Sequence, residues 1–185
     1  MKRIGPCIEL ILVFLFAWVC GGCSKGKNEE VSPLLAGGKK WFSEDKSYAL
    51  RFPKGWVVEP LPFRIAIDPD SRTSVRTSLE SAIQAKTDEE MLRELLHQAG
   101  SNAPPAIDSS GIEQLHQGTG KIAGHPAAWS ALAFVDRETG ARVSMAFAVG
   151  GPRGTVIIHF MLIPRDKFDQ LEPVFRAIAQ SLEFF

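Results

Sequence analysis

The feature that most constrains the fold is a set of three apolar segments in the second half of the chain. Residues 127–135, 141–149 and 155–163 are apolar at most positions, including neighbouring positions that would point to opposite faces of a strand. Strands that are apolar on both faces belong to the centre of a sheet that is covered on both sides. The connections between them, residues 136–140 and 150–154, are too short for parallel crossovers, so we expect antiparallel pairing.

A helix that could cover this sheet is expected after Thr87. Thr87 and Glu90 have the spacing of a capping box, in which each side chain accepts a hydrogen bond from the other residue's backbone amide. An apolar stripe follows, and Gly100 is the expected end of the helix. The stripe consists of Met91, Leu92, Leu95, Leu96 and Ala99.

A second helix is expected over residues 165–182, where large apolar side chains recur every three or four residues. Pro173 lacks an amide hydrogen, so we expect a break or a new helix start near Glu172. Residues 181–185 are expected to be extended. Two helices and a central antiparallel sheet predict an α+β fold. Its architecture is an α/β/α sandwich, with the central antiparallel β-sheet flanked by helices.

Two hairpins are expected outside the three apolar segments. Residues 46–52 alternate as a strand, residues 53–55 (Pro-Lys-Gly) form a turn, and residues 56–58 return. Residues 111–117 are predicted to form another strand that ends in a turn at residues 118–120 (Gly-Thr-Gly).

The first 22 residues have the layout of a signal peptide. Lys2 and Arg3 precede ten apolar residues, 10–19, which are too few to span a bilayer, and small residues follow. The ending Gly21-Gly22-Cys23 resembles the bacterial lipobox, although Cys20 stands where that motif prefers Leu, Val or Ile. The resemblance implies that Cys23 becomes the acylated first residue of a lipoprotein. Simple secretion and an uncleaved anchor are the alternatives.

Residues 23–40 are polar and aperiodic, so we expect the lipidated cysteine and a flexible tether there, followed by a globular domain at 41–185. A short ordered extension around residues 31–36 is the alternative. The chain's three cysteines are Cys7, Cys20 and Cys23, which leaves the mature protein one thiol and excludes disulfides and a cysteine metal site. Acidic and basic residues balance, which argues against nucleic acid as a partner.

Three motifs resemble the PsbP/DcrB-like superfamily, which includes the Ran-binding Mog proteins. They are residues 52–56 (Phe-Pro-Lys-Gly-Trp), residues 122–127 (Ile-Ala-Gly-His-Pro-Ala) and the closing segment 175–184, in which Leu182 replaces the family's Phe. The resemblance covers residues 41–185. It implies an α/β/α sandwich and an accessory or binding protein without a shared catalytic constellation.

The residue types that carry chemistry are scattered. His97, His116, His125 and His159 show no spacing that would hold zinc, and we predict no metal site, no cofactor and no catalytic set. Two residues are candidates for ligand binding. His159 lies on an otherwise apolar strand face, where it is a core histidine, a ligand-binding group or a base. Trp129 lines a groove or belongs to the core.

The sequence therefore predicts a lipid-anchored accessory or binding protein of the cell envelope that is not an enzyme. The expected partners are the membrane, through the lipid, and another envelope protein. The alternatives are a small-molecule carrier, with a pocket between sheet and helix near Trp129 and His159, and a hydrolase that would need an acid beside His159. Ser24 is not the Asp that retains lipoproteins at the inner membrane, so the periplasmic face of the outer membrane is favoured.

Overall fold

The computed structural model describes residues 31–61, 64–80, 87–101 and 111–185, and all contacts below lie in these ranges. The predicted signal peptide, residues 1–22, and Cys23 lie outside them. Most of the loop expected after the first helix, residues 102–110, does so too.

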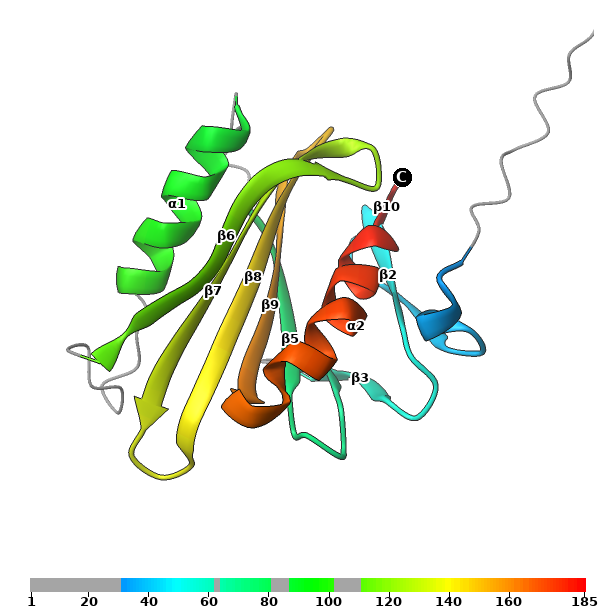
Figure 1. The fold of residues 1–185 in the computed structure, drawn as a ribbon. Helices are drawn as coiled ribbons and strands as arrows, with labels where there is room; N and C mark the ends of the chain where they lie inside the picture. The colour runs from blue at the N-terminus through cyan, green and yellow to red at the C-terminus, as the bar shows by residue number, and fades with distance from the viewer. Residues whose placement is uncertain (1–30, 62–63, 81–86, 102–110) are drawn as a thin grey trace, which may run out of the picture. The chain divides into compact units, whose positions relative to one another are not determined.

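The described residues form a seven-stranded sheet, here called the main sheet, in the order β3-β4-β5-β9-β8-β7-β6 (Figure 1). Every neighbouring pair in it is antiparallel. The three apolar segments are β7, β8 and β9, and none of them is an edge strand, as the sequence predicted. The strands are β3 (Val57–Leu61), β4 (Arg64–Ile67), β5 (Ser74–Glu80), β6 (Glu113–Ile122), β7 (His125–Asp136), β8 (Gly140–Gly151) and β9 (Gly154–Pro164).

A second sheet of three strands, here called the small sheet, has the order β1-β2-β10. β1 (Lys39–Phe42) and β10 (Glu183–Phe184) pair with the two edges of β2 (Tyr48–Phe52), both antiparallel. The end of the chain is therefore extended, as expected. The Tyr48 hydroxyl donates to Thr77 Oγ1 at 3.0 Å, which links the small sheet to β5 of the main sheet.

The two described α-helices cover opposite faces of the main sheet (Figure 1). α1 (Asp88–Ser101) packs on one face in a group of buried residues that we call the α1 cluster. α2 (Phe168–Gln180) and the small sheet share the other face, where the larger core lies. The predicted α/β/α sandwich is confirmed. The α1 cluster consists of Met91, Leu95, Ala128, Ala148 and Ile157.

The start of α1 is the capping box that the sequence predicted. The Glu90 amide donates to Thr87 Oγ1 at 3.2 Å, and the Thr87 amide donates to Glu90 Oε2 at 3.0 Å. These bonds satisfy amides that have no partner inside the helix. The helix ends at Ser101, one residue beyond the expected stop at Gly100.

α2 contains Pro173 without a break, so the predicted interruption near Glu172 is wrong. Pro173 lies on the exposed side of the helix, where water can hydrate the carbonyl that loses its partner. The opposite side buries Phe168, Phe175 and Ile178 completely. Each such side chain contributes about 1.5–3 kcal/mol, which together exceeds the cost of about 3 kcal/mol for one proline.

The hairpin expected between residues 46–52 and 56–58 does not form. Both edges of β2 are already occupied by β1 and β10, and the chain after the turn joins the main sheet as β3, which pairs with β4. The stacking of Phe52 on Trp56, with ring centroids 6.0 Å apart, holds the turn between the two sheets.

The turn expected at residues 118–120 is also wrong, because β6 runs straight through this segment to Ile122. The turn lies instead at Ala123 and Gly124, which both have positive φ, 49° and 80°. This is a two-residue hairpin connection of the kind that matches the twist of the flanking strands.

The folded domain begins earlier than the predicted boundary at residue 41. η1 (Pro33–Leu35) buries Leu35 to 1% exposure, and β1 begins at Lys39, so the second half of the predicted tether is ordered. The compact unit of the structure is Val31–Phe185. The sequence signal was weak because one buried leucine in a polar stretch has no periodicity.

Neither described α-helix is long and apolar enough to cross a bilayer.

Candidate functional site

A row of side chains crosses the main sheet on the face that carries α1. Ser130 on β7, Ala146 on β8 and His159 on β9 lie opposite one another in the strand register. The row continues to Gln117 on β6 and Arg76 on β5. Residues that pair across antiparallel strands point to the same face. Ala146 packs against the α1 cluster, which assigns the whole row to the α1 face. We call these five residues the polar row.

Ser130 is the buried member of the polar row. The residue is 5% exposed, and its Oγ has no hydrogen-bond partner among the described residues. Most buried polar side-chain atoms in proteins have a partner, so a buried hydroxyl without one marks a place where water or a ligand group can bind. The position can accept a hydrogen bond and donate one.

His159 is uncharged at neutral pH. Burial, and to a smaller extent the nearby positive charge of Arg76, together lower its pKa to about 4. A neutral imidazole has one N–H donor and one nitrogen acceptor. The row thus presents a hydroxyl, an imidazole, an amide and a guanidinium along one line.

The polar row is equipped for hydrogen bonding and lacks the parts of a hydrolytic site. None of its five residues is a carboxylate that could orient the His159 ring and stabilise its protonated form, as a general base requires. Ser130 and His159 lie two strands apart, with Ala146 between them, and adjacent strands are about 4.8 Å apart. The serine hydroxyl is therefore too far from the imidazole to be activated by it as a nucleophile.

Trp129, the other candidate from the sequence, lies on the opposite face of the main sheet. It pairs with Phe147 and belongs to the core that α2 and the small sheet cover. Trp129 and His159 therefore cannot line one pocket between sheet and helix, which corrects that expectation. The sequence could not show this, because it depends on the strand register. Ser130 lies in the row of His159, and Trp129, the residue before it, points to the opposite face of the sheet. Whether either residue binds a ligand stays a prediction.

The Trp129 ring already has protein neighbours. Gly118 and Gly120 on β6 leave space for it, and a Cβ at Gly118 would lie 2.6 Å from ring atom Cζ2. The Arg176 guanidinium on α2 lies 5.2 Å from the ring centroid, and its Nη2 pairs with Glu172 Oε1 at 2.6 Å. A ligand that stacked on Trp129 would have to compete with Arg176 for the ring.

The remaining histidines do not converge on His159. His116 contacts Phe168 and His125 contacts Phe184, with ring centroids 5.8 and 4.7 Å apart. The side chain of His97 lies outside the described part of the chain. Within that part, no three His, Cys, Asp or Glu residues come together as metal ligands.

Comparison with solved structures identifies the fold. The cyanobacterial PsbP protein CyanoP of Synechocystis sp. PCC 6803 superimposes with a TM-score of 0.56 and 15% identity, over 80% of this chain and 92% of that one. The Ran-binding protein Mog1p of Saccharomyces cerevisiae superimposes with a TM-score of 0.53 and 10% identity, over 80% and 95% of the two chains. The fold is PsbP/Mog-like.

A structure from Bacteroides thetaiotaomicron matches with a TM-score of 0.50 and 15% identity, over 80% of this chain and 48% of that one. The sequence itself matches no family model and no curated protein. At these identities the likeness concerns the fold alone, and the expected PsbP/Mog-like fold is confirmed.

Proposed function

We propose that this chain is a lipid-anchored accessory protein of the cell envelope that binds a partner protein and catalyses no reaction. The observation that carries the binding part is the polar row, a line of hydrogen-bonding side chains across the α1 face, none of which is a carboxylate. The anchoring part rests on Cys23 at the end of a signal-like leader. Mog1p, which has this fold, is a Ran-binding protein, and this supports a protein as partner.

The anchor is tested by replacing Cys23 and following the protein in cell fractions. Cys23→Ala is expected to abolish incorporation of labelled fatty acid and to release the protein from the membrane fraction, because two or three acyl chains supply the membrane affinity. Cys20→Ala is the matched control and is expected to keep both label and membrane association. Retention of the Cys23→Ala protein in the membrane would contradict the anchor.

The proposed location is the periplasmic face of the outer membrane. It is supported by Ser24, since the retention signal that keeps lipoproteins at the inner membrane is an Asp after the cysteine. Density-gradient separation of the two membranes in the same fractionation places the protein in one or the other.

The binding surface is tested by photo-crosslinking in the native envelope. A crosslinkable residue at Arg76, at the exposed end of the polar row, is expected to yield a discrete protein adduct. The matched control is Arg137, which is equally exposed but lies in the turn between β7 and β8. Adducts at neither position, or at Arg137 alone, would contradict a partner on the α1 face.

A small-molecule carrier is the second candidate, and the buried, unpartnered Ser130 Oγ favours it. The ligand would lie on the α1 face beside His159, without Trp129. Native mass spectrometry of protein isolated from envelopes tests this function: a bound molecule lost in Ser130→Ala supports it. If the protein isolated from envelopes has the same native mass as the protein without a ligand, no molecule is bound, and this argues against a carrier.

A further inference from the structure

The small sheet has an outer face that points away from the main sheet. Lys40 pairs with Arg51, and Phe42, Ala49 and Glu183 lie opposite one another across the three strands. Their neighbours in sequence point inward: Tyr48, Leu50 and Phe52 are part of the core. Phe185 follows the inward-pointing Phe184 and stacks on Phe42, with ring centroids 6.0 Å apart. The outer face thus consists of Lys40, Phe42, Ala49, Arg51, Glu183 and Phe185.

Apolar side chains are exposed on and beside this outer face. Phe42 is 49% exposed and Phe185 is 56% exposed, although each stacks on the other. Val31 and Leu34, which are 44% and 48% exposed, lie on the segment that leads into β1. These are four of the seven exposed large apolar residues in the described part of the chain. The stacked Phe42 and Phe185 are adjacent exposed apolar groups, and such adjacent groups mark an interaction surface.

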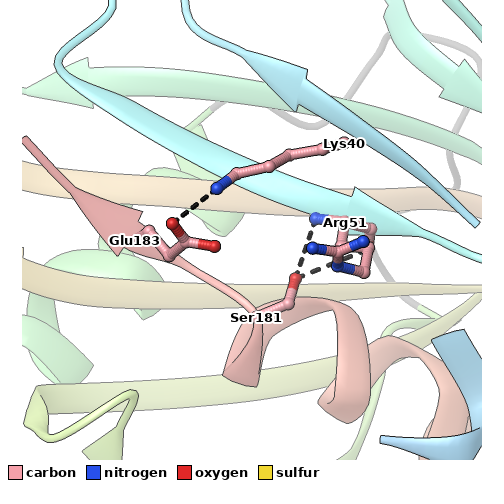
Figure 2. A network of polar contacts seen from close by, with 4 residues as sticks. All are labelled: Lys40, Arg51, Ser181 and Glu183. Atoms are coloured by element: carbon pink, nitrogen blue, oxygen red, sulfur yellow. Dashed lines mark hydrogen bonds and ion pairs between the residues drawn. The ribbon is translucent and has the colours of Figure 1, made fainter. Parts of the chain in front are cut away.

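A network of polar contacts among Lys40, Arg51, Ser181 and Glu183 lies beside the two rings (Figure 2). Lys40 Nζ lies 5.3 Å from the Phe42 centroid and 5.5 Å from the Phe185 centroid, and it pairs with Glu183 Oε2 at 2.5 Å. Below them, the Arg51 amide donates to Ser181 Oγ at 2.8 Å, which ties β2 to the end of α2. Aromatic rings beside a lysine whose charged end stays at the surface suit a lipid–water boundary.

The chain from Cys23 enters the domain beside this face and is short. Nine residues separate Cys23 from Pro33, a span of at most about 35 Å when fully extended, and the flexible tether that the sequence predicts would average about 17 Å as a coil. A domain of this size has a radius of gyration of about 15 Å. An acylated Cys23 therefore keeps one side of the domain at the bilayer.

The entry point decides which side that is. Buried Leu35 holds η1 against the domain, and a Cβ at Gly38 would lie 1.8 Å from the Phe52 carbonyl oxygen, so the chain runs flush against β2 into β1. The short tether pulls on the small sheet first. α1 and the polar row lie on the far side of the main sheet from it.

We propose that the outer face of the small sheet rests on the lipid surface to which Cys23 is anchored. This inference rests on the acylation of Cys23 in the proposed function. Phe42 and Phe185 lie at the boundary between headgroups and acyl chains, and the polar row faces away from the membrane. The two exposed rings supply the apolar part of the contact, and the charged Lys40 and Glu183 of this face pair with each other, so we expect the contact to persist at high salt.

Photo-crosslinking to lipid in native membranes tests this orientation with the full chain. The substitution Phe42→p-benzoylphenylalanine is compared with Val135→p-benzoylphenylalanine. Val135 is 54% exposed and lies at the end of β7, away from the small sheet. We expect phospholipid adducts at position 42 at a several-fold higher yield than at position 135. Phe185→p-benzoylphenylalanine gives the same readout if the change at Phe42 disturbs folding.

Acylation of Cys23 is measured in the same samples by mass spectrometry. Acylated protein with equal lipid yields at positions 42 and 135 overturns the orientation and leaves the anchor in place. Acylated protein whose position 42 links to a protein instead of lipid also overturns it. Protein without acyl chains overturns the proposed anchor and the orientation with it.

Discussion

At the residue scale, His159 is a histidine whose pKa is shifted by its surroundings. Its pKa falls from 6.5 to about 4, mainly through burial and secondarily through Arg76. Between these pH values the unfolded chain binds a proton that the folded protein does not bind. The free energy of unfolding is therefore fully retained above pH 6.5 and decreases as the pH falls toward 4. The slope for one such group reaches about 1.4 kcal/mol per pH unit.

Replacing His159 removes this contribution. His159→Gln is expected to lose less stability than the natural protein between pH 6.5 and pH 4.5, as measured by urea unfolding at both values. Arg76→Gln is the companion variant: it should raise the pKa of His159 only in part, because burial is the larger cause, and an NMR titration follows this directly. An unchanged pH slope in His159→Gln would contradict the assignment.

Gly118 and Gly120 form a matched pair under the Trp129 ring. A Cβ at Gly118 would lie 2.6 Å from the ring, whereas one at Gly120 would make ordinary contacts at 3.5 Å. We expect Gly118→Ala to lower the free energy of unfolding by about 1–3 kcal/mol, in the range of overpacked sites. Gly120→Ala should change it by less than about 1 kcal/mol. Equal effects in urea unfolding would show that the ring moves freely.

At the residue scale, the sequence predicted on which face of its strand a residue lies, but it did not predict which residues of adjacent strands lie beside it. Alternation placed His159 with Ile157 on one face of its strand, and the structure confirms it, since Ile157 belongs to the α1 cluster. Ser130 and Arg76 were not predicted as its companions. They become neighbours only through the register of β7, β8, β9 and β5, which depends on tertiary pairing and includes a register shift between Val143 and Met145 of β8.

At the element scale, Ser181 joins the end of α2 to the small sheet. Its Oγ accepts from the Arg51 amide at 2.8 Å (Figure 2). The same Oγ donates to the Ile178 carbonyl at 2.6 Å. Ser181→Ala leaves the Arg51 amide without this partner, which should lower the free energy of unfolding by about 1–3 kcal/mol. Glu183→Gln, at the half-exposed pair with Lys40, should cost less than about 1 kcal/mol. Equal losses in chemical denaturation would contradict this ranking.

Elements with strong local signals were predicted, and elements defined by distant partners were not. The capping box at Thr87 and the three apolar strands carry their structure in their own sequence. The continuity of α2 through Pro173 and the extension of β6 through Gly118 depend on packing against other elements. The choice of β4 over β2 as partner for β3 likewise follows from β1 and β10, which occupy both edges of β2.

At the scale of the whole molecule, the layers separate two roles. The tether enters at the small sheet, and the polar row lies beyond the main sheet on the α1 face. In the orientation that we propose, an anchored domain would present its hydrogen-bonding groups to a partner in the envelope and its exposed rings to lipid. The spacing of apolar residues in the sequence was enough to predict a central antiparallel sheet with helices on both faces. The start of the domain at η1 could not be predicted in this way, because it depends on a single buried leucine.

The central claim is that acyl chains on Cys23 carry a binding domain to its place in the envelope. The most direct measurement is the mass of the amino-terminal peptide of the protein extracted from membranes. We expect cleavage after Gly22 and a Cys23 that bears a diacylglyceryl group on its thiol. A membrane-extracted protein that retains residues 1–22, or that begins with an unmodified residue, would contradict the account.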